Sequence, residues 1–281
     1  MDNLLFLFIL SGAVGHVIWN ILLKQSSNKI EFTRAFTLFG SIVIFPFLFF
    51  FEPLPKEAWP FFIATMIIHV FYKIFLCKVY DYAGISYGYP ISRGLPSLII
   101  LILTPIFFKD DLSFLNQISV IVISIGILLL VFAEGKFKKI NFKGLLYSLI
   151  VASIIVSYSI IDAKGARLSN ALIYLLYYFA LDGFLFNAIS LFLFKKNRIT
   201  FKFFRNNFKK ITIAAACSVY SYFPAVYGFT VGKVAVVAAL REVSILFASL
   251  YGLIVLKEKG GYLAFFSALL ILCGCVVIKL F

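Results

Sequence analysis

Two arginines stand inside apolar stretches of the chain, where charged side chains are rare. Arg93 lies in the stretch GYPISRGLPS, and Arg241 lies in ALREVS. A charge at the centre of a bilayer costs at least about 2.5 kcal/mol, so each arginine should face a water-filled cavity or an ionic partner. A guanidinium grips carboxylate, phosphate or phosphonate groups with paired hydrogen bonds. We therefore expect the two arginines to bind an anionic group, or else to form ion pairs with Glu242 and Asp182.

The residues around Arg93 interrupt a regular helix. Pro90 and Pro96 lack backbone N–H groups, and the two neighbouring glycines let the backbone bend or approach another helix. Carbonyl groups freed in this way are tolerated in a membrane only against protein or a water-filled cavity. The stretch is expected to line a cavity, with Tyr89 in its wall. A packing kink is the alternative.

A second polar group lies near the start of the chain. His16, Trp19 and Asn20 are spaced i, i+3 and i+4, so a helix would place them on one face. Such a polar stripe should point into a helix bundle. It would contact a substrate there or form hydrogen bonds between helices.

Further candidates lie in the third apolar segment of the chain. His69 and Lys73 are one helical turn apart, and Tyr72 lies beside them. Lys73 could supply another cationic group to a cavity, or its ammonium group could extend to the cytoplasmic membrane interface.

Aromatic hydroxyl groups are plentiful in the second half. Tyr158 lies in SYSIID, and Tyr220 and Tyr222 lie in VYSYFPAVY. These tyrosines could shape a pocket for a small amphiphile, or could belong to the core or to an interfacial belt. Together with Trp19 they could also form an aromatic cage for a cation such as choline.

The elements that position these residues are transmembrane helices. Of the 281 residues, 63% are hydrophobic and only 14% are charged, which is far from the composition of a soluble domain. A spanning helix needs about 20 mostly apolar residues. By that measure the chain has ten segments, at residues 4–23, 35–51, 59–77, 84–108, 115–133, 144–161, 171–194, 211–229, 232–256 and 262–280. The predicted fold class is an all-α integral membrane protein with ten transmembrane helices.

Basic residues predict the orientation of these helices. The net charge is +14, but most of the 26 Lys and Arg lie in short loops, 17 on one side of the membrane and six on the other. Such an asymmetry is typical of membrane topology and gives little support for nucleic-acid binding. The richer side should be cytoplasmic, so both termini are predicted to be non-cytoplasmic, in a cell (inner or plasma) membrane. The first apolar run has no small-residue cleavage site, so we expect it to be retained.

Ten segments divide into two halves of five. The predicted units are residues 1–134, a basic cytoplasmic linker at 135–143, and residues 144–281. Because each half has an odd number of helices, the halves should be inverted relative to each other, as in many secondary transporters. Shifting the chain by 148 residues places Arg93 on Arg241, which is consistent with an internal repeat.

Several of these pieces resemble one transporter family. His16, Trp19, Asn20 and Lys24 match a pattern H-x-x-W-N-x-x-x-K, and YPISRG, ALREVS and SYSIIDAKGAR are similar to further family segments. On these residues the chain resembles the drug/metabolite transporter superfamily, in particular EamA-type proteins. The resemblance implies two inverted five-helix repeats around a central cavity, often in an exporter of amino acids or other small metabolites.

The chain also departs from the family pattern. Many members end the fourth and ninth helices with a Gly-Glu step, whereas this chain has Lys109-Asp110 and Lys257-Glu258. The resemblance therefore does not fix the geometry of those helix ends.

The expected function is secondary transport of a small polar metabolite, an amino acid or an organic anion, by alternating access around a cavity at the membrane midplane, with export as the expected direction. His16, Trp19, Asn20, Tyr72, Lys73, Tyr89, Arg93, Tyr158, Tyr220 and Arg241 are the candidate substrate contacts. His69, Asp182 and Glu242 are the candidates for a coupling proton or for ion pairs. No cofactor or metal is expected, and the partners are the solute and the bilayer, with the protein a monomer or homodimer.

The alternatives are a choline-like cation transporter and a lipid or lipid-phosphate flippase. A membrane enzyme is disfavoured because the sequence has only two histidines and scattered acids, and ATP-driven transport because it has no Walker motif.

Overall fold

The computed structural model describes residues 1–83, 88–133, 141–194, 199–247 and 262–280. All the regular structure in these ranges is helical. The α-helices are α1 (Asn3–Gln25), α2 (Lys29–Ile44), α3 (Trp59–Tyr82), α4 (Tyr89–Phe108), α5 (Phe114–Ala133), α6 (Phe142–Leu168), α7 (Ala171–Leu193), α8 (Phe201–Val231), α9 (Val234–Arg241) and α11 (Tyr262–Leu280). Two short 3-10 helices, η1 (Phe45–Phe50) and η2 (Lys56–Ala58), lie between α2 and α3.

Within the described ranges, nine helices are long and apolar enough to cross a membrane. They are α1 to α8, with α2 extended by η1 and α3 by η2, and α11. The protein is therefore an α-helical, multi-pass membrane protein. This confirms the class that its composition predicts.

Most predicted segments agree with a helix, and the differences lie at helix ends. The segment predicted at 35–51 begins earlier, at Lys29, because the Asn28 side chain accepts the Glu31 N–H and caps the helix. The segment predicted at 211–229 begins at Phe201, where Thr200 caps α8. Hydropathy alone misses such starts because the first turns of these helices are polar.

The predicted segment 232–256 is interrupted near the middle of the bundle. Helix α9 ends at Arg241, and tight bonds from the Glu242 and Val243 N–H groups to carbonyls three residues earlier close its last turn. A new helical turn follows over residues 244–247. The rest of this segment and the Lys257-Glu258 step that follows it lie outside the described residues.

Helix α4 begins at Tyr89, so Arg93 is its fifth residue. The segment predicted from hydropathy begins at residue 84, and residues 84–87 lie outside the described part of the chain. Pro96 and Pro105 lie within α4.

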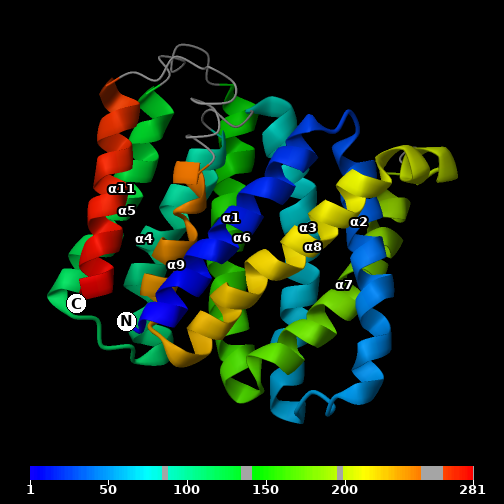
Figure 1. Cartoon of the computed structure of the whole chain (residues 1–281), viewed down its shortest axis with the longest axis horizontal. Coiled ribbons are helices and arrows are strands. Elements are labelled where there is room, and N and C mark those ends of the chain that lie inside the picture. Colours follow the sequence, from blue (N-terminus) through cyan, green and yellow to red (C-terminus); the bar gives the residue numbers. More distant parts are fainter. Residues whose placement is uncertain (84–87, 134–140, 195–198, 248–261, 281) are drawn as a thin grey trace.

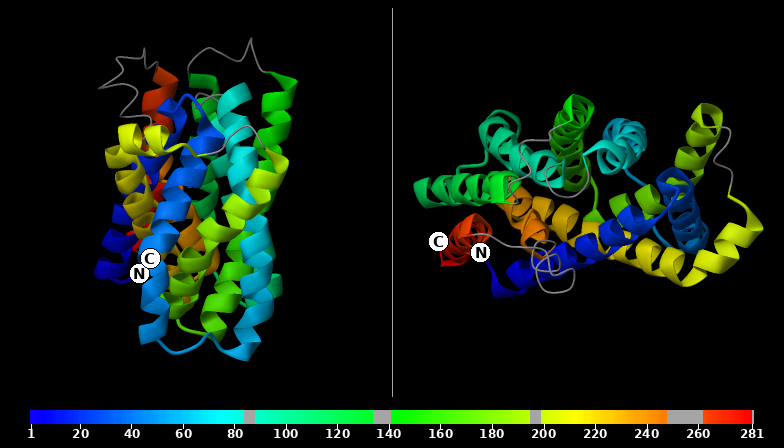
Figure 2. Two further views of the ribbon diagram at one scale, coloured as in Figure 1. Left: turned by 90° about the vertical axis from the view of Figure 1, so that its right-hand side faces the viewer. Right: turned by 90° about the horizontal axis from the view of Figure 1, so that it is seen from above.

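The helices pair across the bundle (Figure 1). The most extensive contacts join α5 to α11, α3 to α6, α1 to α8 and α2 to α7, while α4 packs against α5, α6 and α9. The α5–α11 pair and the α2–α7 pair form opposite ends of the bundle, as the view from above also shows (Figures 1 and 2). Helix α1 begins and helix α11 ends on the same face of the bundle, called here the termini face (Figure 1).

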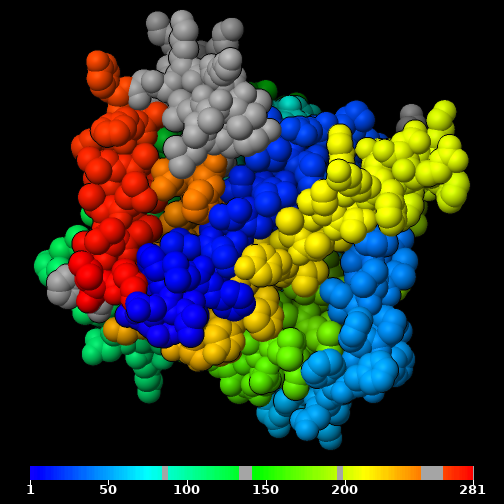
Figure 3. Space-filling view, in the orientation of Figure 1, coloured from blue at the N-terminus to red at the C-terminus, as the bar shows by residue number. Residues whose placement is uncertain are grey.

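Small residues allow α1 and α8 to cross closely. A Cβ atom on Gly12 would lie 2.9 Å from Pro224 Cγ, and one on Gly15 would lie 3.2 Å from the Tyr220 ring. Close approach at small residues is the usual way for helices to associate in lipid. In the space-filling view α1 and α8 lie side by side across one face of the molecule (Figure 3).

The basic side chains used to predict orientation lie partly outside the described residues, as does most of the linker at 135–143. Arg34 is one of the 17 basic residues assigned from the sequence to loops on the predicted cytoplasmic side, and the structure places it within a helix instead. It belongs to α2, only 2% of its surface is exposed, and its Nε donates to Asn187 Oδ1 of α7 at 3.1 Å. The earlier helix start places it inside the bundle.

Candidate functional site

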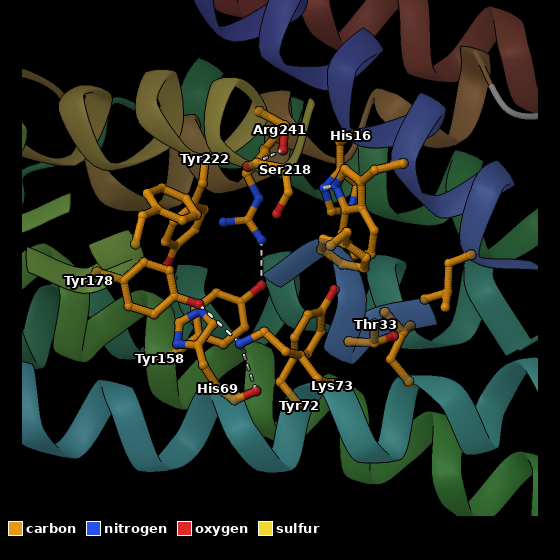
Figure 4. A pocket seen from close by; sticks show the side chains of 16 residues that line it. His16, Thr33, His69, Tyr72, Lys73, Tyr158, Tyr178, Ser218, Tyr222 and Arg241 are labelled. Atoms are coloured by element: carbon orange, nitrogen blue, oxygen red, sulfur yellow. Dashed lines mark hydrogen bonds between the residues drawn. The ribbon is translucent and has the colours of Figure 1, made fainter. Parts of the chain in front are cut away.

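A cavity of about 50 Å³ lies between α1, α2, α3, α6, α7, α8 and α9 (Figure 4). Its volume is enough for a few water-sized groups. Aromatic and aliphatic side chains form most of its wall, and polar groups converge on it from several helices. The lining residues are His16, Trp19, Leu23, Thr33, Phe36, His69, Tyr72, Lys73, Leu76, Tyr158, Tyr178, Phe179, Ser218, Ser221, Tyr222 and Arg241.

Arg241 enters the cavity from the last residue of α9. Its Nη2 donates to the Tyr158 hydroxyl at 2.5 Å, and its guanidinium lies 5.5 Å from the ring centres of both Tyr158 and Tyr222. Its Nη1 is buried and has no hydrogen-bond partner among the described residues. The break after α9 therefore delivers a positive charge with a spare donor to the cavity (Figure 4).

His16 offers a second unpartnered nitrogen to the same cavity. Its Nδ1 accepts the Trp19 indole N–H at 3.2 Å. Since an indole N–H can only donate, Nδ1 carries no proton, and neutral His16 carries its proton on Nε2. That Nε2 is buried without a partner in the described part of the chain. Trp19 thus sets the tautomer that makes His16 a donor.

Lys73 lies inside the cavity and does not extend to the interface. Its ammonium group contacts Asp182 Oδ1 of α7 at 2.5 Å, the Tyr178 hydroxyl at 3.4 Å and the His69 carbonyl at 3.4 Å. The interfacial alternative for Lys73 is wrong, because a carboxylate in the bundle neutralises the charge. Asp182, a candidate for a coupling proton, is its partner in this ion pair.

His69 and Tyr72 line the cavity from α3; Tyr72 was predicted to contact a substrate, whereas His69 was predicted as a site for a coupling proton or an ion pair. The His69 ring lies 4.4 Å from the ring centre of Tyr158 and 4.8 Å from that of Tyr178. Its Nδ1 lies 2.9 Å from the Thr65 hydroxyl. These contacts join α3 to α6 and α7 at the cavity wall.

Arg93 lies beside the cavity but is not among its lining residues. Its Nε is 2.8 Å from Glu242 Oε2, its guanidinium lies 5.8 Å from the Tyr89 ring centre, and only 1% of its surface is exposed. Arg241 Nε lies farther from the same carboxylate, at 3.9 Å. The two arginines thus approach one acid, but only Arg241 reaches the cavity. Tyr89 also lies outside the cavity wall, with its hydroxyl 3.4 Å from Ser244 Oγ.

Two further candidates lie away from the cavity. Asn20 donates to the His16 carbonyl at 2.7 Å and accepts from the Tyr80 hydroxyl at 2.5 Å, so it joins α1 to α3. Tyr220 is 47% exposed on α8, and its hydroxyl lies 2.7 Å from Ser11 Oγ. Of the ten candidate substrate contacts, the structure gathers His16, Trp19, Tyr72, Lys73, Tyr158 and Arg241 in one cavity.

Asp162 is a buried acid that is not among the site residues predicted from the sequence. It lies one turn after Tyr158 on α6, is 1% exposed, and accepts hydrogen bonds from the hydroxyl groups of Tyr174, at 2.9 Å, and Tyr222. Its position i+4 from a candidate substrate contact is the signal that could have found it.

Comparisons with known proteins identify the fold and no family. No family model and no curated protein sequence matches the chain. Among solved structures, 29 chains match. One of them, a crystal structure described only as that of a protein, has a TM-score of 0.76 and 17% sequence identity and covers 100% of this chain and 99% of its own. At that identity the likeness concerns the fold alone.

Proposed function

We propose that this protein is a secondary transporter of small metabolites that carry an acid group, such as amino acids or organic anions. The observation that carries this proposal is the arrangement around Arg241. A guanidinium with a spare N–H and the unpartnered Nε2 of His16 line the same cavity, whose wall is otherwise largely aromatic and aliphatic. A carboxylate would satisfy both donors, and an apolar remainder would contact the wall.

The charge balance also favours an acid group over a cation. Two of the buried carboxylates nearby are already neutralised, Asp182 by Lys73 at 2.5 Å and Glu242 by Arg93 at 2.8 Å. Arg241 Nε lies 3.9 Å from Glu242, farther than Arg93 Nε does, so Arg241 interacts with that acid more weakly. The third buried acid, Asp162, is held by tyrosine hydroxyl groups, so among the described residues Glu242 is the one acid within ion-pair distance of Arg241, and a ligand's acid group would give Arg241 a direct partner.

We propose further that the chain has ten membrane spans in two inverted five-helix repeats, as in EamA-type drug/metabolite transporters. Exchanging α1 with α6, α2 with α7, α3 with α8, α4 with α9 and α5 with α11 converts the α1–α8 contact into α6–α3, and both contacts are extensive. The α2–α8 contact likewise becomes α7–α3, and the α2–α7, α4–α9 and α5–α11 contacts map onto themselves. A broken helix that carries a charge into the bundle is also typical of transporter binding sites.

A choline-like cation is the second candidate, because seven aromatic residues besides the histidines line the cavity: Trp19, Phe36, Tyr72, Tyr158, Tyr178, Phe179 and Tyr222. Such a ligand would bind by cation–π contacts and leave Arg241 as a structural residue. The two candidates make opposite demands on Arg241, so one substitution separates them.

The test is a thermal-unfolding screen of the detergent-purified protein with leucine, methylphosphonate and choline. A ligand that binds only the folded state raises the unfolding temperature. We expect leucine or methylphosphonate to do so, and Arg241→Gln to abolish the shift. Arg205→Gln is the matched control, because Arg205 is exposed on α8. Stabilisation by choline alone, retained in Arg241→Gln, would contradict the acid-group proposal.

A further inference from the structure

We propose that Asp162 is the binding site of a coupling proton, so that solute movement through the cavity is linked to proton movement across the membrane. This inference rests on the transport function proposed above and adds the ion that drives it. The proton binds to a carboxylate oxygen of Asp162, and the neighbouring hydroxyl groups keep their own protons.

Asp162 differs from the other buried acids in its partners. Asp182 and Glu242 each lie within ion-pair distance of a cation. Asp162 has no lysine or arginine within that distance among the described residues, although only 1% of its surface is exposed. A buried charge without an ionic partner is costly, and such a group avoids the cost by binding a proton. Asp162 is therefore the buried acid best suited to change its protonation.

Hydroxyl groups from separate helices now hold this carboxylate. Tyr174 of α7 donates to Oδ1 at 2.9 Å, and Tyr222 of α8 donates to Oδ2. The Thr65 hydroxyl of α3 also faces it. Movement of α3 or α8 away from α6 would remove donors and leave the carboxylate in apolar surroundings. Proton binding would then neutralise the carboxylate, whose charge the hydrogen bonds no longer stabilise.

Asp162 lies between the cavity and the termini face. Tyr158 and His69 line the cavity, and Asp162 and Thr65 lie one helical turn away from them, toward the end of α6 and the start of α3. Those helix ends are on the termini face (Figure 1). The cluster thus forms part of the barrier that closes this side of the cavity, where a transporter must open and reclose.

A contact chain connects Asp162 to the solute site. The Tyr222 hydroxyl donates to Asp162, and the ring of Tyr222 lies 5.5 Å from the Arg241 guanidinium. An acid group that draws Arg241 toward His16 would change its contact with Tyr222 and hence the hydrogen bonding of Asp162.

Titratable or charged groups face Asp162 from every surrounding helix. They are Tyr158 (α6), His69 through Thr65 (α3), Tyr174 and Tyr178 (α7), Tyr222 (α8) and Arg241 (α9).

The other half of the chain contains a neutral counterpart. Asn20 on α1 accepts from the Tyr80 hydroxyl of α3 at 2.5 Å, as Asp162 on α6 accepts from the Tyr222 hydroxyl of α8. An amide thus serves where only a hydrogen bond between helices is needed. The carboxylate at Asp162 adds the ability to bind a proton, and Asp162→Asn should fold because it copies an arrangement that the protein already uses.

The first test is infrared difference spectroscopy between acid and neutral pH on the protein in lipid nanodiscs. This measurement needs no solute. We expect a band from a buried, protonated carboxyl group that is absent in Asp162→Asn and retained in Asp111→Asn, which alters an exposed carboxylate. If Asp162→Asn retains every carboxyl band of the wild-type protein, the proposal is overturned, whether or not the protein transports leucine.

The second test measures radiolabelled leucine in proteoliposomes with a pH gradient imposed in either direction. One pH unit coupled to one proton per leucine supports up to about tenfold accumulation. We expect the wild-type protein to accumulate leucine in one direction of the gradient, Asp162→Asn to lose this accumulation, and Asp162→Glu to restore part of it. Accumulation unchanged in Asp162→Asn would refute proton coupling at this residue. Absence of any leucine flux in the wild-type protein would instead count against the proposed function, and the infrared result would still decide whether Asp162 binds a proton.

Discussion

Arg93 and Arg241 occupy similar sequence contexts, yet their surroundings differ. Both arginines have nitrogens without a hydrogen-bond partner in the described part of the chain, but Arg93 lies against Glu242 outside the cavity wall, whereas Arg241 donates to Tyr158 and lines the cavity. The sequence identified both as intramembrane charges but could not decide which one an acid would neutralise. That choice depends on how α4 and α9 pack, which no local pattern encodes.

The Lys73–Asp182 pair provides a prediction at the scale of single residues. Both groups are buried, so Lys73→Met or Asp182→Asn alone leaves an uncompensated charge, and removing one partner of such a pair typically costs about 3–5 kcal/mol. The double variant Lys73→Met, Asp182→Asn leaves no charge, and its unfolding temperature in detergent should recover toward the wild-type value. If each single variant unfolds like the wild type, the pair is not formed.

At the scale of helices, Asp110 joins the two halves of the chain at the termini face. It follows α4, its Oδ1 lies 3.3 Å from Arg167 Nη2 of α6, and its Oδ2 accepts the Val234 N–H at 3.0 Å, at the start of α9. Arg167 also donates to the Phe229 carbonyl at 2.8 Å, at the end of α8. Asp110 and Arg167 together thus connect the ends of α4, α6, α8 and α9.

We predict that Asp110→Ala lowers stability by about 2 kcal/mol, because charge-assisted hydrogen bonds are lost and the start of α9 becomes uncapped. Asp111→Ala is the control, since Asp111 is exposed beside it. Thermal unfolding of the two purified variants makes the comparison. Equal stability of the variants would argue against this role of Asp110.

The α2–α7 contact depends on a close approach at Gly183. Its N–H donates to Ser41 Oγ at 2.8 Å, and a side chain there would meet the backbone of Thr37. Gly183→Val should therefore separate the helices and destabilise the protein by at least about 1–3 kcal/mol. Gly40→Ala is the matched control on α2, because its nearest neighbour would be Ala215 Cβ at 3.7 Å. Equal unfolding temperatures for the two variants would contradict this packing.

Helix positions were largely predictable because apolar length determines them, whereas the interruption after Arg241 was not. Apolar residues resume directly after the charged pair in ALREVS, and a tight turn that contains neither Gly nor Pro carries no local sequence signal. The candidate site residues were likewise predicted only in part. The spacing of His16 and Trp19 predicted a shared face correctly, but the exposure of Tyr220 depends on which face of α8 meets lipid.

At the scale of the whole molecule, the orientation in the membrane stays a prediction from the basic residues. Both termini are expected outside the cytoplasm, so alkaline phosphatase fused after Phe281 should be active in a bacterial host, and a fluorescent protein at that position should stay dark. A fusion in the basic loop between α7 and α8 should behave in the opposite way. Fluorescence from the fusion at Phe281 would reverse the assignment of the two faces.

Transport through the cavity at Arg241 is the central claim, and uptake into protein-only liposomes tests it most directly. Wild-type protein, Arg241→Gln and Arg205→Gln are reconstituted at equal density, and entry of radiolabelled leucine, methylphosphonate and choline is followed beside translocation of a labelled lipid headgroup. We predict saturable uptake of leucine or methylphosphonate by the wild-type protein and Arg205→Gln, and its loss in Arg241→Gln. Uptake that Arg241→Gln leaves unchanged, or translocation of the headgroup alone, would contradict the claim.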